Sequence, residues 1–373
     1  MVRRAWVTCG LLGACTLACG GGSSTPAELP ASAGGASIAG GQAGTGGVTS
    51  MAARAGAGGA ARTALCDSSG GMTGVSSAGV PSVGGQAGNG GAGWCEGYVN
   101  ITSVADVFEF AKRQCETLDG SLAVSGRNIP DLDKLAPSPL RTVTGSLNIS
   151  QASDLKSIAG LAGLRTIGHS FGVSMNPLLD SLAGLESLER IGTDPCTDSI
   201  IIQDNAALTS IDALRNATLS GTIYIGANDA LTSLAALGHL KQSGDLFIAG
   251  GKSVTELGLA DLEECGDCKI SSLPRLKQLT LPSLKYARRL LISNDVRLVT
   301  LSLPVLETVT KDFSVTINDE LTSMGSLDRL VSVGTMQIAE NPKLPQCFVD
   351  ALGARLGACQ AHCGSNDEAA TCP

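Results

Sequence analysis

A pattern of about 23 residues recurs along the C-terminal three quarters of this 373-residue chain. It is clearest at residues 221–243, GTIYIGANDALTSLAALGHLKQS. Gly221 opens the unit, and Ile223 and Ile225 alternate as the inward side chains of a β-strand do. After an Asn-Asp turn, leucine recurs at every third position through Leu240. This spacing is typical of a chain that bends while one side stays inward.

The pattern opens ten times in register. The openings are Gly120, Gly145, His169, Asp198, Gly221, Gly244, Gly266, Arg288, Lys311 and Gly334. Successive spacings are 25, 24, 29, 23, 23, 22, 22, 23 and 23 residues. A fixed period of this length indicates a solenoid whose turns bury their apolar sides against their neighbours. No unit has the roughly ten residues of 3.6 periodicity that a helical repeat needs. The sequence therefore predicts stacked parallel strands, with Ile225, Ile248 and Ile270 above one another.

The shared pattern of these units is G-x-L-x-I-x-x-N-x-x-L-x-x-L-x-x-L-x-x-I. It resembles the receptor L-domain, the β-helix of insulin and EGF receptor ectodomains and of fungal wall-anchored proteins. The resemblance covers roughly Cys95 to Leu356. It implies an all-β fold, a right-handed parallel β-helix of about ten turns over residues 94–356. It also implies that one sheet face holds a ligand.

The ends of a solenoid need caps, because an open end would expose the core. We expect an N-terminal capping helix that begins at Ser103 and Asp106 and ends near Gln114. A second helix is expected at Pro345–Leu356, followed by a cysteine-rich tail at residues 357–373. The L-domain family has a cysteine pair flanking its first turn, which implies a bond between Cys95 and Cys115.

Residues 1–19, MVRRAWVTCGLLGACTLAC, have the features of an export signal. Two arginines precede an apolar stretch that is too short to span a bilayer as a helix. A small residue before cysteine resembles the lipidation site of bacterial lipoproteins. We favour Cys19, which a Gly-rich tether follows, with Cys15 as the alternative and an unlipidated secretory signal as a further one. Lipidation predicts a membrane-anchored protein of the bacterial envelope, exposed at the outer membrane.

Residues 20–93 form a low-complexity segment. They hold 23 of the chain's 48 glycines and only four charged residues. Such a composition cannot bury enough apolar surface to offset the entropy of ordering the chain. We therefore expect a disordered linker between the anchor and the solenoid.

The chain contains thirteen cysteines. Export permits disulfides, and removing Cys9, Cys15 and a lipidated Cys19 leaves an even number. The disulfide candidates are Cys95, Cys115, Cys265, Cys268, Cys347, Cys359, Cys363 and Cys372. The last four allow three pairings. Cys265 and Cys268 are expected to be core cysteines or a local bridge, because no second pair stands at zinc-binding spacing.

Charge excludes one class of partner. Without Arg3 and Arg4 the chain has 24 basic and 34 acidic residues, a balance that disfavours nucleic acid. The three histidines show no metal-ligand spacing, and no catalytic motif is present, so no cofactor or metal is predicted. A carbohydrate-active β-helix enzyme stays open as an alternative, because Asp245, Asp267 and Arg289 fall on consecutive turns. A purely structural envelope protein is a second alternative.

Two features point to recognition instead. Ile201, Tyr224 and Phe247 should face outward on three consecutive turns, with Leu291 two turns on, and exposed apolar patches often mark interaction sites. A structural ladder, in which like residues stack on successive turns, is the alternative for this row. An insertion at residues 192–197 lengthens one turn, and such insertions often lie on the binding face, with a neutral loop as the alternative. We predict a non-catalytic, ligand-binding or adhesion protein whose partner is a protein or glycan at the cell surface. A third row, of Asn side chains after each strand, is predicted to be structural. It consists of Asn176, Asn205, Asn228, Asn294, Asn318 and Asn341.

Overall fold

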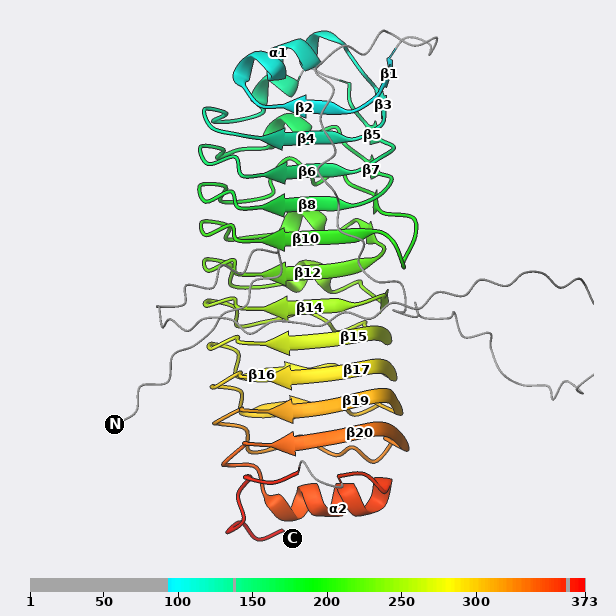
Figure 1. The fold of residues 1–373 in the computed structure, drawn as a ribbon, viewed down its shortest axis with the longest axis vertical. Helices are drawn as coiled ribbons and strands as arrows, with labels where there is room; N and C mark the ends of the chain where they lie inside the picture. Colours follow the sequence, from blue (N-terminus) through cyan, green and yellow to red (C-terminus); the bar gives the residue numbers. More distant parts are fainter. Residues whose placement is uncertain (1–92, 137–138, 360–362, 373) are drawn as a thin grey trace, which may run out of the picture. The chain divides into compact units, whose positions relative to one another are not determined.

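The computed structural model describes residues 93–136, 139–359 and 363–372. The predicted signal, with Cys15 and Cys19, and all but the last residue of the predicted linker lie outside these ranges. The described residues form the predicted right-handed parallel β-solenoid (Figure 1). The chain advances by one strand of the large sheet per turn.

Eleven strands follow one another in the large sheet, and every pair is parallel. They are β2 (Val99–Ile101), β4 (Leu122–Ser125), β6 (Leu147–Ser150), β8 (Phe171–Ser174), β10 (Ser199–Gln203), β12 (Thr222–Gly226), β14 (Leu246–Ala249), β15 (Glu264–Ser271), β17 (Tyr286–Ser293), β19 (Thr308–Thr316) and β20 (Ser332–Ala339). This is one strand more than the ten openings, because β2 lies inside the segment that we predicted only as a cap. A short strand β13 (Gln242–Ser243) also joins this sheet by pairing with β15.

Two smaller sheets complete the turns. One contains β1 (Trp94–Glu96), β3 (Thr117–Asp119), β5 (Thr142–Val143), β7 (Thr166–Ile167), β9 (Arg190–Ile191) and β11 (Thr218–Leu219). The other pairs β16 (Gln278–Thr280) with β18 (Thr300–Ser302). In the C-terminal turns the strands of the large sheet lengthen to eight or nine residues. Each of these long strands forms two sides of its turn. Nearer the N-terminus, one of those sides is formed by a separate short strand.

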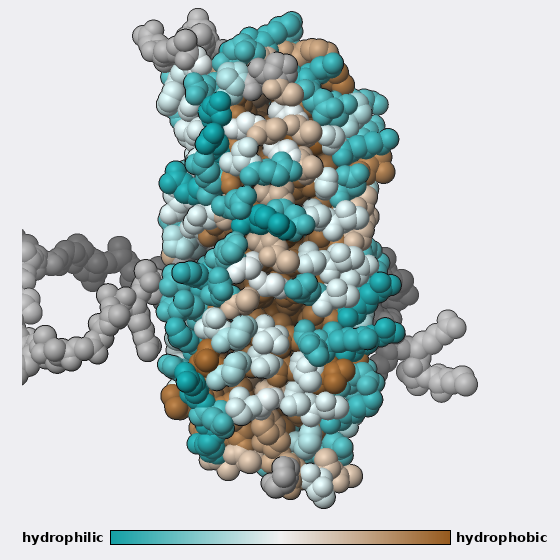
Figure 2. Space-filling model, turned by 180° about the vertical axis from the view of Figure 1, so that it is seen from behind, coloured by the Kyte–Doolittle hydropathy of each residue, from teal (hydrophilic) through white to brown (hydrophobic). Residues whose placement is uncertain are grey.

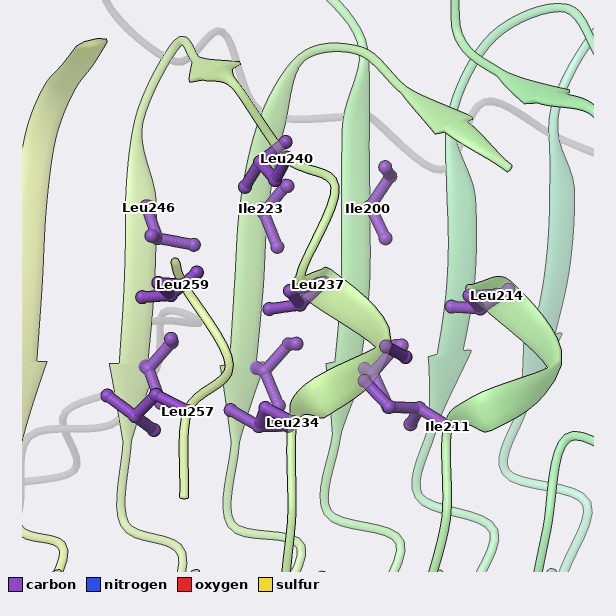
Figure 3. Close-up of a cluster of buried hydrophobic side chains, with 14 of the residues drawn as sticks. Ile200, Ile211, Leu214, Ile223, Leu234, Leu237, Leu240, Leu246, Leu257 and Leu259 are labelled. Carbon is purple, nitrogen blue, oxygen red and sulfur yellow. The ribbon is translucent and has the colours of Figure 1, made fainter. Parts of the chain in front are cut away.

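The core is a stack of identical positions from successive turns. Ile225 pairs in register with Ile248, and Ile248 with Ile270, as the period predicts. All three side chains are at most 3% exposed. Figure 3 shows leucines from the far side of the turns, such as Leu237 and Leu240, on the side of the large sheet where the strand residues Ile223 and Leu246 point. Each turn therefore buries its apolar residues only against its neighbours, as a solenoid must.

Four of the bends with leucine at every third position contain short 3₁₀ helices. These are η1 (Asp133–Leu135), η2 (Ala159–Leu161), η3 (Asp212–Leu214) and η4 (Ala235–Leu237). A 3₁₀ helix has three residues per turn, so side chains three apart point the same way. Leu234 and Leu237 are therefore both buried, at 0% and 2% exposure.

The glycine openings are explained by close packing at the corner. A Cβ atom on Gly266 would lie 1.7 Å from the carbonyl oxygen of Gly244 in the preceding turn. No side chain fits at that distance, so successive corners can approach only where the residue has none.

A buried ladder of polar side chains lies at the opposite end of the strands. Its members are Asn176, Asn205, Asn228, Asp295, Asn318, Asn341 and Asn366, all at most 7% exposed. The prediction of Asn294 was wrong, because Asn294 is exposed and its neighbour Asp295 occupies the buried position. Asn294 instead takes the left-handed conformation that precedes the ladder residue, with φ 59°, which asparagine tolerates.

Ile317 occupies the same left-handed position one turn later, with φ 59°. A β-branched residue is strained there, and left-handed backbone costs roughly 1–2 kcal/mol for ordinary residues. Its side chain is 42% exposed and gains little from packing. We expect Ile317→Asn to raise the free energy of unfolding in urea by about 1 kcal/mol. The reverse change at the equivalent corner, Asn294→Ile, should lower it, and equal stability of both variants and wild type would refute the explanation.

Both ends of the stack are capped by helices. Helix α1 (Val104–Lys112) begins as predicted, with a capping box between Ser103 and Asp106, and ends two residues before Gln114. Its buried face presents Val107 and Phe110, whereas Val104 and Phe108 are exposed.

Helix α2 (Gln346–Leu356) closes the other end, in the segment predicted for it. Val349 and Leu352 are buried against the last turn. Its Arg355 donates hydrogen bonds to the carbonyl oxygens of Leu327 and Leu330, at 2.7 and 2.8 Å.

Candidate functional site

The outward row at the centre of the large sheet is the candidate site. Ile201 pairs in register with Tyr224, and Tyr224 with Phe247. Neighbouring strands lie about 4.8 Å apart, so these three side chains form a continuous row along the solenoid axis. All three are half-buried. Lys269, which is exposed, separates them from Leu291, the fourth residue predicted for this row.

Two glycines lie beside the apolar row. A Cβ on Gly226 would lie 3.0 Å from Cε1 and Oη of Tyr224, so the ring lies along its own strand over the glycine. Gly172 is the next residue of the row on the N-terminal side of Ile201. Tyr224 and Ile201 therefore each have a neighbouring position without a side chain on the outer face of the sheet.

A ladder of serines lies beside this row in the N-terminal turns. The Ser146 hydroxyl accepts the backbone N–H of Ser170 at 3.3 Å, and the Ser170 hydroxyl accepts that of Ser199 at 3.0 Å. Each of these hydroxyls accepts a hydrogen bond from the backbone of the next turn. The short serine side chains therefore form a regular line along one edge of the apolar row.

Charged residues replace the serines in the later turns. Arg288 donates to Asp267 at 2.6 Å and to Asp245 at 2.9 Å, and Arg289 donates to Asp267 at 2.7 Å and to Asp312 at 2.9 Å. The Arg288 side chain is only 8% exposed. Sequence reasoning missed its role, although a charge at an opening position, where most turns have glycine, was the available signal.

The ion pairs determine the protonation of Asp267. Burial alone would raise the pKa of Asp267, but hydrogen bonds from Arg288 and Arg289 and their charges outweigh it and lower that pKa below its ordinary value. The carboxylate is therefore held ionised between two guanidinium groups. A group that donates a proton to a leaving sugar needs the opposite, a raised pKa.

The insertion at residues 192–197 is fixed to the solenoid by Asp198. One Asp198 carboxylate oxygen accepts the backbone N–H groups of Thr193 and Asp194 at 2.7 and 2.8 Å, and the other lies 3.1 Å from His169 Nδ1. Burial raises the pKa of Asp198, but these hydrogen bonds and the His169 charge lower it overall.

Four disulfides join the eight candidate cysteines. The pairs are Cys95–Cys115, Cys265–Cys268, Cys347–Cys372 and Cys359–Cys363. Cys265 and Cys268 are buried in the core within β15, at 0% and 1% exposure, so this bridge is shielded from solvent. Cys95 and Cys115 flank helix α1. At the other end, Cys347 in the first turn of α2 is joined to Cys372, and the Cys359–Cys363 bridge follows the helix.

Two kinds of feature are absent from the described ranges. No group of three or more His, Cys, Asp or Glu side chains in this part of the chain has a geometry suited to a metal ion. None of its helices has both the length and the apolar character needed to cross a bilayer. The side of the solenoid seen in Figure 2 has hydrophilic residues over its whole length.

Comparison of the chain with protein-family models, with curated proteins and with solved structures finds no match.

Proposed function

We propose that this protein is a non-catalytic recognition or adhesion protein, and that the apolar row of Ile201, Tyr224 and Phe247 contacts its ligand. The observation that supports this is three large apolar side chains, half-buried on consecutive rungs, with Gly172 beside Ile201 and Gly226 beside Tyr224. Aromatic side chains present much contact area at a small entropic cost, and they are frequent among the residues that dominate binding. Leu291 extends the row beyond Lys269.

We further propose that the chain is an exported bacterial lipoprotein with a receptor L-domain-like solenoid. The export signal and Cys19 support the anchor, with Cys15 as the alternative acceptor of the lipid. The repeat pattern and the parallel stacking of its turns support the likeness to the L-domain. In that arrangement the linker holds the solenoid away from the membrane, where a protein or glycan at the cell surface can reach the large sheet.

The pairing of the charged cluster favours recognition over the enzymatic alternative. Asp245 and Asp267, the carboxylates that an enzyme would use, are held by Arg288. Both therefore already have a cationic partner, and we assign the cluster to the structure of the large sheet.

The first experiment identifies the ligand and tests the row. A chain of residues 20–373, which lacks the lipidation cysteines, is applied to glycan and protein arrays, and hits are measured in solution. We expect the double variant Tyr224→Asp, Phe247→Asp to bind at least tenfold more weakly, a change of about 1.4 kcal/mol. Two carboxylates in the row would have to be desolvated on binding.

The matched control places the same charges elsewhere on the same row. Asn148 and Ser314 occupy the equivalent outward positions of β6 and β19. The variant Asn148→Asp, Ser314→Asp should bind like the wild type. Unchanged binding by a folded Tyr224→Asp, Phe247→Asp variant would remove the proposed surface, and turnover of an array glycan would favour the enzyme instead.

A further inference from the structure

One step of the solenoid, between the turns of β12 and β14, lacks a strand pairing that the neighbouring steps have. In the smaller sheet that contains β11, hydrogen bonds run from turn to turn as far as this strand, where the Thr218 N–H donates to the Glu189 carbonyl at 2.8 Å. They resume where the Glu263 N–H donates to the Lys241 carbonyl at 2.8 Å. Between these points β11 pairs only with β9, and β13 pairs only with β15. No backbone hydrogen bond within the described residues joins β11 to β13.

The buried polar ladder is interrupted from the same step onward. Asn228 ends its N-terminal part and Asp295 begins its C-terminal part, by accepting the Leu273 N–H at 2.8 Å. Gly251 and Leu273 occupy the ladder positions between them, and neither has a polar side chain. A Cβ on Gly251 would lie 2.7 Å from Cγ2 of Val254, so an asparagine does not fit there unless Val254 moves. A cavity of about 10 Å³ lies beside Asn228, Gly251 and Leu273, so the core is less completely packed at this point.

The path of the chain on the far side also changes at this step. In the turn of β12, Leu234 and Leu237 lie three residues apart at the 3₁₀ helix η4. In the turn of β14, the buried residues Leu257 and Leu259 lie two apart on a stretch that is not helical (Figure 3). Two-residue spacing continues in the next two turns, with the buried pairs Leu279 and Leu281, and Leu301 and Leu303. Turns of two shapes therefore meet between β12 and β14.

Two other sides of the step remain joined. The large sheet is continuous, because β12 pairs with β14 in register. On the far side the Leu234 N–H donates to the Glu256 carbonyl at 3.0 Å. An ion pair between Lys252 and Asp229 also crosses the step, but it is exposed and such pairs contribute little. The large sheet, the apolar core and the bond to Glu256 are therefore what holds the two turns together.

In a solenoid each turn contacts only its neighbours, so stability is a sum of terms for the turns and for the steps between them. Proteins open in cooperative parts whose boundaries fall where the connections are weakest. The step between β12 and β14 combines the unpaired strands, the interrupted ladder and the change of shape. We propose that the solenoid consists of two cooperative units that meet at this step, an N-terminal unit from β1 to β12 and a C-terminal unit from β13 to α2.

The two units share the proposed binding row. Ile201 and Tyr224 lie on the N-terminal unit, and Phe247 lies on the C-terminal unit. A ligand that covers all three side chains contacts both units and holds them together. This consequence rests on the proposed function, whereas the division of the solenoid does not.

A conservative core substitution beside the step tests the boundary. Ile202→Val removes one methyl group from β10, and β6 and β14 lie two rungs from β10 in opposite directions. Hydrogen exchange is followed by mass spectrometry in the chain of residues 20–373. We expect amide exchange to be roughly fivefold faster in β6, which belongs to the same unit, and unchanged in β14. Equal acceleration on both sides would show that no boundary exists at this step, and unchanged exchange in β6 would show that the N-terminal unit is not cooperative.

The matched control is Ile292→Val in β17, with β14 and β20 two rungs away in opposite directions. Ile202 and Ile292 are both 0% exposed, so the two substitutions remove the same group from equivalent surroundings. Because β14, β17 and β20 belong to one unit, exchange in β14 and β20 should accelerate by the same factor. An effect of Ile292→Val on only one side would overturn the proposal. Neither measurement uses a ligand, so failure of the proposed binding surface would leave these outcomes unchanged.

Discussion

Replacing Asp295 by asparagine is expected to raise the free energy of unfolding at pH 8 by roughly 4 kcal/mol. Asp295 is the one carboxylate in the buried ladder of side-chain amides, and it is 0% exposed. Its burial raises its pKa to about 7, with a smaller opposing effect from the hydrogen bond of the Leu273 N–H. An asparagine there avoids the burial of a negative charge.

The neighbouring turns show what the asparagine gains. Asn228 and Asn341 each donate through Nδ2 to a strand carbonyl of the preceding turn, Ile202 at 2.9 Å and Val315 at 3.0 Å. At the equivalent position of Asp295, the atom Oδ2 has no hydrogen-bond partner within the described residues. An ionised carboxylate has no proton to donate to a carbonyl, whereas an amide or a protonated carboxyl does.

The sign of the pH dependence follows from the raised pKa. In the unfolded chain Asp295 ionises near its ordinary value of 3.8, and in the folded chain near 7. Below pH 3.8 both states are protonated, so wild type and variant should have similar stability. Between these values the wild type progressively loses stability relative to the variant, and above pH 7 the difference is constant.

Urea unfolding from pH 4 to pH 8 measures this difference. As a control, Asp319→Asn removes an exposed carboxylate from the following turn and should change stability little at any pH. The opposite substitution, Asn228→Asp, should create a second pH-dependent loss at neutral pH. A stability gain for Asp295→Asn that does not vary with pH would contradict the explanation.

Removal of one ladder amide, by Asn205→Ala, is expected to lower the free energy of unfolding by roughly 4 kcal/mol. Asn205 donates to the carbonyl oxygens of Val173 and Gln203, both at 2.9 Å, and accepts the Asn176 N–H at 3.1 Å. Its backbone N–H and Nδ2 also bond to Asn228. Truncation leaves buried groups of two neighbouring turns unpaired, and each costs about 1–3 kcal/mol.

Asn148→Ala serves as the matched control, because Asn148 is an exposed asparagine on the outer face of the same sheet. It should change stability by less than about 0.5 kcal/mol in urea unfolding. Similar losses from both variants would mean that the ladder amides do not join the turns. Since turns in a solenoid interact with their nearest neighbours, hydrogen exchange in the Asn205→Ala variant should accelerate first in β8 and β10.

Local periodicity was enough to predict the stacked core. Leucines and isoleucines at fixed steps select the inward side of each turn, and each turn repeats the same local arrangement. Ile225, Ile248 and Ile270 therefore stack as predicted. The Ser103 cap is also local, because its partner Asp106 lies three residues away.

Pairs of adjacent residues with similar chemistry were harder to assign. Asn294 and Asp295 both suit a corner, and only the path of the backbone decides which one is buried. The N-terminal strand β2 was missed because it is only three residues long and a helix follows it, although Gly97 opens its rung 23 residues before Gly120. In the candidate site, likewise, the outward row was predicted, but the packing of the Tyr224 ring over Gly226 was not.

The sequence by itself determined the period, the inward side chains and the outward row of Ile201, Tyr224 and Phe247, because these follow from spacing along a single turn. Only the tertiary structure decided the pairing of the C-terminal cysteines and the ion pairs of Arg288. The ion pairs join Arg288 to Asp267 and Asp245, which lie one and two turns earlier in the chain and meet it only when the turns are stacked.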